Sequence, residues 1–388
     1  MDFSLNDDHL ALREAVRRFC DGEYPAQHRG NPETPEVAAQ RWAGMAELGL
    51  LGLPFEADYG GSDLTAVEVM VAAQELGRAL GGGAWIPTVV LAGQLLAAAG
   101  TPTQRSQWLP RIASGELQVA LACSEAEARY DIADVEARAS RADGGWVLDG
   151  RKTLVLNGDN AGLLLIVART SGARRDRAGL TIFAVDAGTP GLNVRGFDTL
   201  DGRRAAHVEL RGVRVSDDRI VGPVGGAYDI VETAVDRAAA ALCADAAGAL
   251  DALIDLTAEH LRTRKQFGAP LAKFQVLQHR LADMVIALEQ AKSMACAAAM
   301  AVEAGDVPQR RRIVSAAKTL IGQLGRQVGL TAIQLHGAMG MTDECRIGHY
   351  AKRLLVIDQL FGDARHHLQR FAGHLEHSEQ GHQPRVHS

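Results

Sequence analysis

The stretch Arg264-Lys-Gln-Phe-Gly-Ala-Pro-Leu-Ala-Lys-Phe-Gln275 separates two long helical patterns and decides how the C-terminal half of the chain is organised. Gly268 favours a turn, because glycine tolerates left-handed backbone. The turn presents the cation of Arg264 beside the ring of Phe267, and the amide of Gln275 follows where the next helix begins. A guanidinium group matches phosphate oxygens and an amide can read adenine, so this set suits a dinucleotide cofactor. A plain helix–loop–helix turn is the alternative interpretation.

Composition and charge restrict the class of protein. The chain has 388 residues, 47% of them hydrophobic and 23% charged, with a net charge of −6. This balance predicts a soluble chain of two or three domains and indicates neither disorder nor a nucleic-acid partner. The N-terminus does not resemble a signal peptide, and the best membrane candidate, residues 84–100, is short of a span. Five widely spaced cysteines without a Cys-x-x-Cys motif predict a cytoplasmic, reduced protein without a structural metal.

Hydrophobic spacing divides the first 223 residues into two regions. Residues 1–116 carry apolar residues at helical spacing and predict an N-terminal helical domain, with one of its helices over 89–99. Residues 117–223 alternate short apolar runs with turn residues, which predicts about seven strands in a β-barrel or sandwich, including separate strands at 206–210 and 213–215. Tight turns are expected at 143–145 and 148–150. These strands do not alternate with helices, so a Rossmann domain is disfavoured.

Residues 224–375 predict a C-terminal bundle of four long helices with apolar stripes. Residues 376–388 are expected to form a flexible tail. The pair His366 and His367 is expected to be solvated surface rather than a metal site. The four helical patterns cover residues 227–261, 274–291, 306–337 and a segment from about 347 towards the C-terminus.

Short motifs recur in a fixed order along almost the whole chain. With the turn at Arg264 they resemble the acyl-CoA dehydrogenase family, and the closest likeness is to the small subunit of pimeloyl-CoA dehydrogenase. The resemblance implies a mainly α fold with a central β domain: N-terminal helical domain, β-barrel and C-terminal four-helix bundle. The family motifs are Leu48-Gly-Leu-Leu-Gly-Leu-Pro54 with Tyr59-Gly-Gly61, Trp146-x-Leu-Asp-Gly-x-Lys152, Asn157-Gly158, Gly212-Val-Arg-Val215 and Gln334-Leu-His-Gly-Ala-Met-Gly340; the subunit motifs are His349-Tyr-x-Lys-Arg353 and Leu360-Phe-Gly-Asp-x-x-His-His367.

The resemblance implies FAD bound between domains and across a subunit interface of a homo- or hetero-oligomer, a dimer or tetramer. Arg264 would meet the pyrophosphate of a neighbouring subunit's FAD, and Arg237 would bind substrate. A plain helix C-cap is the alternative for the segment 334–340. Leucines replace the family's flavin-flanking Trp and Thr at positions 154 and 156, which implies weaker or differently tuned flavin binding. The implied cofactor positions are Leu121, Ser124, Leu154 and Leu156 on the β domain, and Arg264, Gln266, Phe267, Phe274, Gln275, Gln334, His336, Gly337 and Ala338 on the bundle.

The implied chemistry needs a base for the α-proton of an acyl thioester, while the flavin takes a hydride from the β-carbon. The family places a Glu in a Tyr-Glu-Gly stretch, where this chain reads Phe361-Gly362-Asp363, or on the first bundle helix before an Arg. Neither Glu is present here. Asp363 and Asp245 are the leading candidates for the base, followed by Asp236. Each could instead be an ion-pair partner or a helix cap, and a chain without a base remains an alternative.

Three functions remain open. The leading one is an acyl-CoA dehydrogenase acting on a medium-length, branched or dicarboxylic acyl-CoA and passing electrons to an electron-transfer flavoprotein. The second is a non-catalytic or half-site subunit that completes a partner's active site. The third is a flavin oxidase or monooxygenase on the same scaffold.

Overall fold

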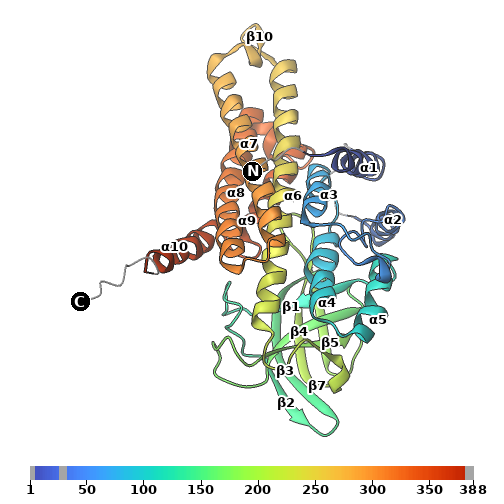
Figure 1. Ribbon diagram of the computed structural model, residues 1–388. Coiled ribbons are helices and arrows are strands. Elements are labelled where there is room, and N and C mark those ends of the chain that lie inside the picture. The colour runs from blue at the N-terminus through green and yellow to red at the C-terminus, as the bar shows by residue number, and fades with distance from the viewer. Residues whose placement is uncertain (1–4, 26–32, 381–388) are drawn as a thin grey trace, which may run out of the picture.

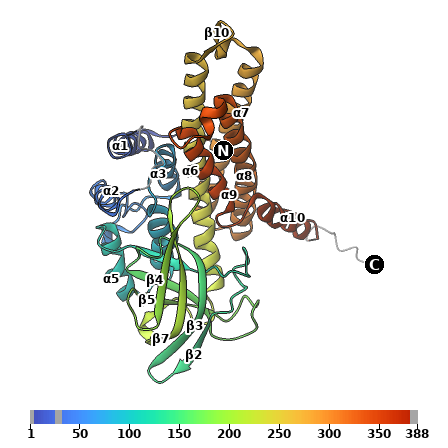
Figure 2. The same cartoon turned by 180° about the vertical axis from the view of Figure 1, so that it is seen from behind.

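The computed structural model describes residues 5–25 and 33–380, with only the backbone for 374–380. The expected order of helical, β and helical parts is confirmed, and the β domain lies at one end of the molecule (Figure 1). Seen from behind, helix α10 (Ala364–Gln380) extends away from the other helices (Figure 2). The first part of the expected tail is therefore helical, and residues 381–388 lie outside the described residues. The domain boundaries stay a prediction.

Side-chain caps explain where several N-terminal helices begin. Asn6, Thr65 and Thr101 accept hydrogen bonds from backbone N–H groups in the first turns of three helices. The pattern expected as one helix over 89–99 begins earlier, with a buried π-helix. The segments are α1 (Asp7–Glu23), α2 (Pro35–Glu47), the 3-10 helix η2 (Ala57–Tyr59), α3 (Ala66–Arg78), the π-helix η3 (Ile86–Gly93), α4 (Gln94–Ala99) and α5 (Pro102–Ala113).

The middle domain is an eight-stranded sheet with the order β6-β7-β3-β2-β4-β5-β8, and β1 pairs in parallel with β4. The turn expected at 148–150 is wrong, because β3 continues through it with a shift of register. The runs at 206–210 and 213–215 form one strand, and the sequence patterns missed β6 and β8. The strands are β1 (Val119–Ala122), β2 (Arg138–Ala142), β3 (Gly145–Leu156), β4 (Leu163–Arg169), β5 (Leu180–Asp186), β6 (Leu192–Asp198), β7 (Arg204–Val215) and β8 (Ile220–Val221).

The C-terminal part is built around the 36-residue helix α6. The expected fourth helix is instead two helices, α9 and α10, because the chain breaks at residues 360–363. Helix α7 is long and apolar enough to cross a membrane by length and composition alone, and half of its apolar window is buried in the protein. The elements are α6 (Tyr228–Thr263), the hairpin β9 (Lys265–Gln266) and β10 (Ala269–Pro270), η5 (Leu271–Lys273), α7 (Gln275–Glu303), α8 (Val307–His336), η6 (Gly337–Met341), α9 (Arg346–Gln359) and α10.

Two glycines let α3 and α6 approach closely. A Cβ added at Gly77 would lie 2.1 Å from the carbonyl oxygen of Asp245, and one at Gly248 would lie 1.8 Å from that of Gln74. The crossing joins the N-terminal helices and the bundle in one hydrophobic core, which also covers a face of the sheet. This packing holds the α9–α10 break near the β domain.

Candidate active site

The break between α9 and α10 has an unusual backbone. Phe361 has φ of +57° and Gly362 has φ of +113°. Left-handed backbone at a non-glycine residue is strained and often marks a functional site. A Cβ added at Gly362 would lie 2.6 Å from Cδ2 of His366 and 2.7 Å from Nε2 of His367. The two imidazole rings therefore fill the space beside position 362, where the family resemblance expected a glutamate side chain.

His367 is buried, with 1% of its surface exposed, so the expectation of a solvated side chain is wrong. Its Nε2 lies 3.0 Å from the Phe361 carbonyl oxygen, and its Nδ1 lies 3.3 Å from the Ser315 hydroxyl on α8. Burial, reinforced by the nearby Lys318 cation, lowers the pKa of His367 to about 2. The first turn of α10 packs this ring against α8, which makes it a neutral structural residue.

Asp363, the leading candidate base, caps α10. Its Oδ1 accepts a hydrogen bond of 2.7 Å from the backbone N–H of His366. The side chain is half-buried at the α9–α10 break. The structure thus gives Asp363 a capping role and keeps it beside the position of the missing glutamate.

The loop that follows β1 packs over the α9–α10 break. The Tyr130 hydroxyl donates a hydrogen bond of 3.3 Å to Oε1 of Gln359, and the Tyr130 ring lies 5.2 Å from the His366 ring. The same loop begins at Ser124, whose carbonyl oxygen accepts a hydrogen bond of 2.9 Å from the Thr153 N–H. One loop therefore links an expected flavin-facing position to the helix break. Nothing in the sequence patterns singled out Tyr130.

A buried ion pair fixes the shape of this loop. Lys152 Nζ donates a hydrogen bond of 2.7 Å to Oε1 of Glu125. The Glu125 carboxylate also accepts the backbone N–H groups of Glu136 and Ala137, at 2.8 and 3.1 Å. Burial lowers the pKa of Lys152, and Glu125 opposes that shift. Glu125 ties the two ends of the loop together and so positions Tyr130.

The four expected flavin positions on the β domain differ in accessibility. Leu154 is 39% exposed with φ of +50°. Ser124, which follows β1, is half-buried, and its carbonyl oxygen is hydrogen-bonded to Thr153, the residue before Leu154. Leu156 is half-buried and packs on the core, while Leu121 is only 4% exposed. Ser124 and Leu154 are therefore the positions open to a ligand.

The other candidate carboxylates are held in buried ion pairs. Asp245 accepts hydrogen bonds from Arg353, and Asp236 accepts them from Arg310 on α8 and Arg370 on α10. Asp245 and Asp236 are 2% and 1% exposed. The structure brings neither of them to the surface of the helix break.

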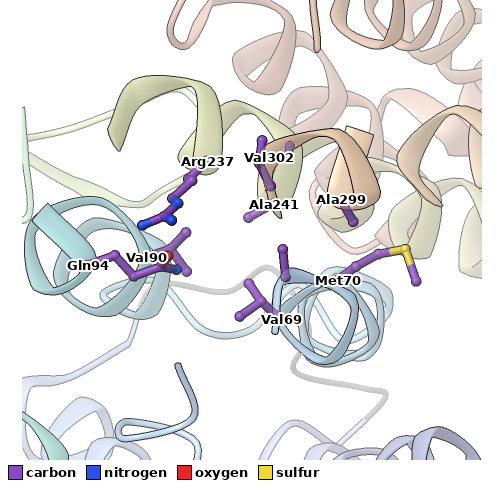
Figure 3. A pocket seen from close by; sticks show the side chains of 10 residues that line it. Val69, Met70, Val90, Gln94, Arg237, Ala241, Ala299 and Val302 are labelled. Atoms are coloured by element: carbon purple, nitrogen blue, oxygen red, sulfur yellow. The ribbon is translucent and has the colours of Figure 1, made fainter. Parts of the chain in front are cut away.

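Arg237, the expected substrate-binding residue, lines a separate cavity of about 10 Å³ (Figure 3). Its side chain extends from α6 towards Val90 and Gln94. The guanidinium Nε is buried without a hydrogen-bond partner among the described residues, and burial lowers the pKa of Arg237. The cavity lining comes from α3, η3, α4, α6 and α7, so Arg237 is not brought together with the α9–α10 break.

The expected pyrophosphate and adenine residues gather at the far end of the bundle. Arg264 ends α6, and the ring of Phe267 is 91% exposed beside Phe274. His336, at the end of α8, stacks on His260 of α6 with ring centroids 4.3 Å apart. This stacking places the α8 end, with the following residues Gly337 and Ala338, near the end of α6. The exposed members of the set are Arg264, Gln266, Phe267, Gln275, Gln334, Gly337 and Ala338.

The expected cofactor positions on the β domain and those on the bundle lie near opposite ends of α6 within one copy of the chain. Helix α6 begins beside the β domain and ends at Arg264 (Figure 1). At 1.5 Å per residue its 36 residues span roughly 54 Å. One cofactor cannot touch both sets in a single copy of the chain.

Three family models match the chain. They are the N-terminal domain of acyl-CoA dehydrogenase over residues 6–116, its middle domain over 120–214 and its C-terminal domain over 225–375. The chain belongs to the acyl-CoA dehydrogenase family. This family membership makes it a flavoprotein oxidoreductase that acts on acyl-CoA.

Individual relatives agree with this assignment. The chain is 31% identical to the mitochondrial 2-methylacyl-CoA dehydrogenase of Solanum tuberosum over 89% of this chain and 84% of that one. Butyryl-CoA dehydrogenase from Megasphaera elsdenii has a TM-score of 0.88 at 24% identity, covering 97% of this chain and 100% of that one. A FAD complex of PigA has a TM-score of 0.89 at 24% identity, covering 97% and 99%. These two structures show the shared fold. The closer likeness to the pimeloyl-CoA dehydrogenase small subunit stays a prediction.

FAD is the cofactor of this chain. The polar side chains at the expected cofactor positions that have no protein partner in the described part of the chain suit its chemistry. Among the described residues, the Arg264 guanidinium and the amides of Gln275 and Gln334 have no protein hydrogen-bond partner. A guanidinium and two amides suit a pyrophosphate and an adenine. On the β domain, the Ser124 hydroxyl is 3.9 Å from the Cys123 thiol and is free to meet a stronger acceptor.

Proposed function

We propose that this chain is a FAD-dependent acyl-CoA dehydrogenase that forms a double bond between the α- and β-carbons of an acyl-CoA thioester. The observation that supports this most is the Tyr130 loop, which is hydrogen-bonded to β3 at Ser124 and contacts the α9–α10 break through Tyr130. An acyl thioester in this space would have the flavin on one side and a proton acceptor on the other. We propose a medium-length, branched or dicarboxylic acyl group, an electron-transfer flavoprotein as electron acceptor, and a cytoplasmic setting.

The residues of the break supply orientation and a proton acceptor, while bound FAD supplies the hydride acceptor. The Glu125–Lys152 pair holds the loop against β3, and Tyr130 contacts the break from this loop. Partial burial there strengthens electrostatic interactions with the polarised thioester. Asp363 lies at the break, whereas the Asp245 carboxylate is hydrogen-bonded to Arg353 in the protein interior. We therefore place the proton acceptor at the break. Substrate binding by Arg237 stays a prediction.

We also propose that two copies, or this chain and a related subunit, share each FAD. The separation of the two sets of cofactor positions along α6 supports this arrangement. Exposed apolar side chains on α7 and α8 mark a surface suited to a partner, with Val276, Ile286 and Leu330 each more than half exposed. A groove of about 320 Å³ between these helices contains Gln334.

A half-site subunit is the alternative function. Gly362 has no side chain where the family resemblance expects a glutamate, and Leu156 cannot donate a hydrogen bond to a flavin. In that case the protein expressed alone would be colourless and would acquire flavin only with a partner chain. The test is the visible spectrum of the protein expressed alone, followed by anaerobic titration with acyl-CoA. Loss of the oxidised flavin bands on titration supports the dehydrogenase.

A further inference from the structure

We propose that His366 accepts the α-proton of the substrate, in place of the carboxylate that is absent from position 362. The inference rests on the proposed function and names the catalytic residue for it. His366 was expected to be a solvated surface residue. The structure instead places its ring in the space of the missing side chain.

Geometry separates His366 from its neighbour. The His366 ring contacts the Cβ position of Gly362 on one side and the Tyr130 ring on another. Both ring nitrogens of His367 lie within 3.3 Å of protein oxygens. Neither ring nitrogen of His366 has a protein hydrogen-bond partner among the described residues. His366 is therefore the imidazole at the break that is free to bind a proton.

The charges around His366 suit a base. Burial, with a smaller contribution from Arg370, lowers the pKa of His366 below its ordinary 6.5, and Lys318 on α8 acts in the same direction. This shift favours the neutral ring, which is the form that accepts a proton. The carboxylates of Asp363 and Asp131 oppose this shift and would stabilise the imidazolium once it forms.

The chemical step balances within the proposed reaction. The α C–H bond breaks, its proton goes to an imidazole nitrogen of His366, and its electron pair forms the new carbon–carbon double bond. The β C–H bond breaks with its electron pair, and bound FAD would accept this hydride. The thioester would thereby lose two electrons to the flavin, and the imidazolium later returns its proton to solvent.

Proton exchange tests this role without any redox turnover. A β-thia acyl-CoA has an acidic α C–H but no β C–H, so it cannot lose a hydride. The flavin-loaded protein is incubated with this thioester in D2O, and deuterium at the α-carbon is measured by mass spectrometry. We expect His366→Gln to slow the exchange by about 100-fold or more. Added imidazole should restore exchange to His366→Ala, which a purely structural role would not permit.

Arg365→Gln is the matched control, because Arg365 is exposed in the first turn of α10, one residue before His366. We expect this variant to keep exchange within about twofold of the wild-type protein, since it removes a solvent-screened charge but no proton acceptor. Circular dichroism and flavin content establish that each variant is folded and loaded.

Several outcomes overturn the role of His366 alone: wild-type exchange in His366→Gln, no rescue of His366→Ala by imidazole, or a loss of exchange in Arg365→Gln as large as that in His366→Gln. A wild-type protein that carries flavin but neither exchanges the α-proton nor bleaches with acyl-CoA overturns the proposed function together with this role.

Discussion

Arg353 on α9 forms an ion pair with Asp245 on α6 in the interior of the protein. Its Nε and Nη2 donate hydrogen bonds of 3.2 and 2.5 Å to the two carboxylate oxygens, and both residues are 2% exposed. Arg353 Nη1 donates a further bond of 2.7 Å to Asp201, which follows β6. Arg203 approaches Asp245 at 3.4 Å and donates to the Gly81 carbonyl oxygen. One buried ionic network therefore ties the bundle, the β domain and the N-terminal helices together.

Asp245→Asn should destabilise the protein, because among the described residues it leaves Asp201 as the only carboxylate near the buried Arg353 and the half-buried Arg203. Breaking a buried ion pair costs about 3–5 kcal/mol of unfolding free energy. Asp255 lies on the same helix as Asp245 and forms an exposed ion pair with Arg78 of α3, so Asp255→Asn should cost less than about 1 kcal/mol. Urea unfolding measures both. Loss of flavin reduction in a fully stable, flavin-loaded Asp245→Asn protein would instead identify Asp245 as the base.

Gly362→Ala should also destabilise the protein. Its φ of +113° is unfavourable for alanine, and the new Cβ would press on both imidazole rings. We expect a loss of about 1–3 kcal/mol. Gly373→Ala on α10 has open space around its Cβ position and should be neutral or stabilising by up to about 1 kcal/mol. Equal thermal stability of the two variants would contradict the geometry of the break.

His367 should make the protein acid-sensitive. Its pKa is about 2 in the folded protein and about 6.5 when unfolded, so the unfolded chain binds the proton first. This contribution to stability is complete above pH 6.5 and declines as the pH falls towards 2, by up to about 1.4 kcal/mol per pH unit. Between pH 7 and 5 the wild-type protein should lose about 2 kcal/mol more than His367→Gln. The control is His279→Gln, because His279 is exposed. If the free energy of unfolding changes with pH equally in the wild-type protein and in His367→Gln, His367 is not the source of the acid sensitivity.

Arg264→Ala should release FAD while the helices stay folded, because the exposed guanidinium is expected to bind the pyrophosphate rather than another protein group. Arg262→Ala, two residues earlier and also exposed, should keep its flavin. Flavin absorbance per protein after gel filtration compares the two, and circular dichroism reports the fold. Full flavin retention in Arg264→Ala would count against the turn as a cofactor site.

Hydrophobic period and turn residues predicted most of the fold. The stripe that begins at Phe274 and the cap at Asp306 mark helices whose apolar faces pack locally into the bundle. The patterns missed β6, because it lies at the edge of the sheet and carries polar residues such as Asn193 and Arg195. Local spacing cannot show pairing to a distant strand, so the runs at 206–210 and 213–215 predict two strands where β7 is continuous.

The candidate site was less predictable. The missing glutamate at Gly362 was visible in the sequence, but the break in the helix there was not. Burial of His367 depends on Ser315, and the stacking of His366 depends on Tyr130, both distant along the chain. Such tertiary contacts leave no periodic signal in the sequence. Sequence patterns alone therefore predict a solvated surface position for the histidine pair.

Anaerobic titration of the purified protein, followed by its visible spectrum, tests the central claim most directly. We predict oxidised flavin bands that fade as acyl-CoA is added under nitrogen, with one enoyl-CoA formed per flavin reduced. Flavin bands that persist at saturating acyl-CoA, with the protein alone and with a co-expressed partner chain, would contradict it.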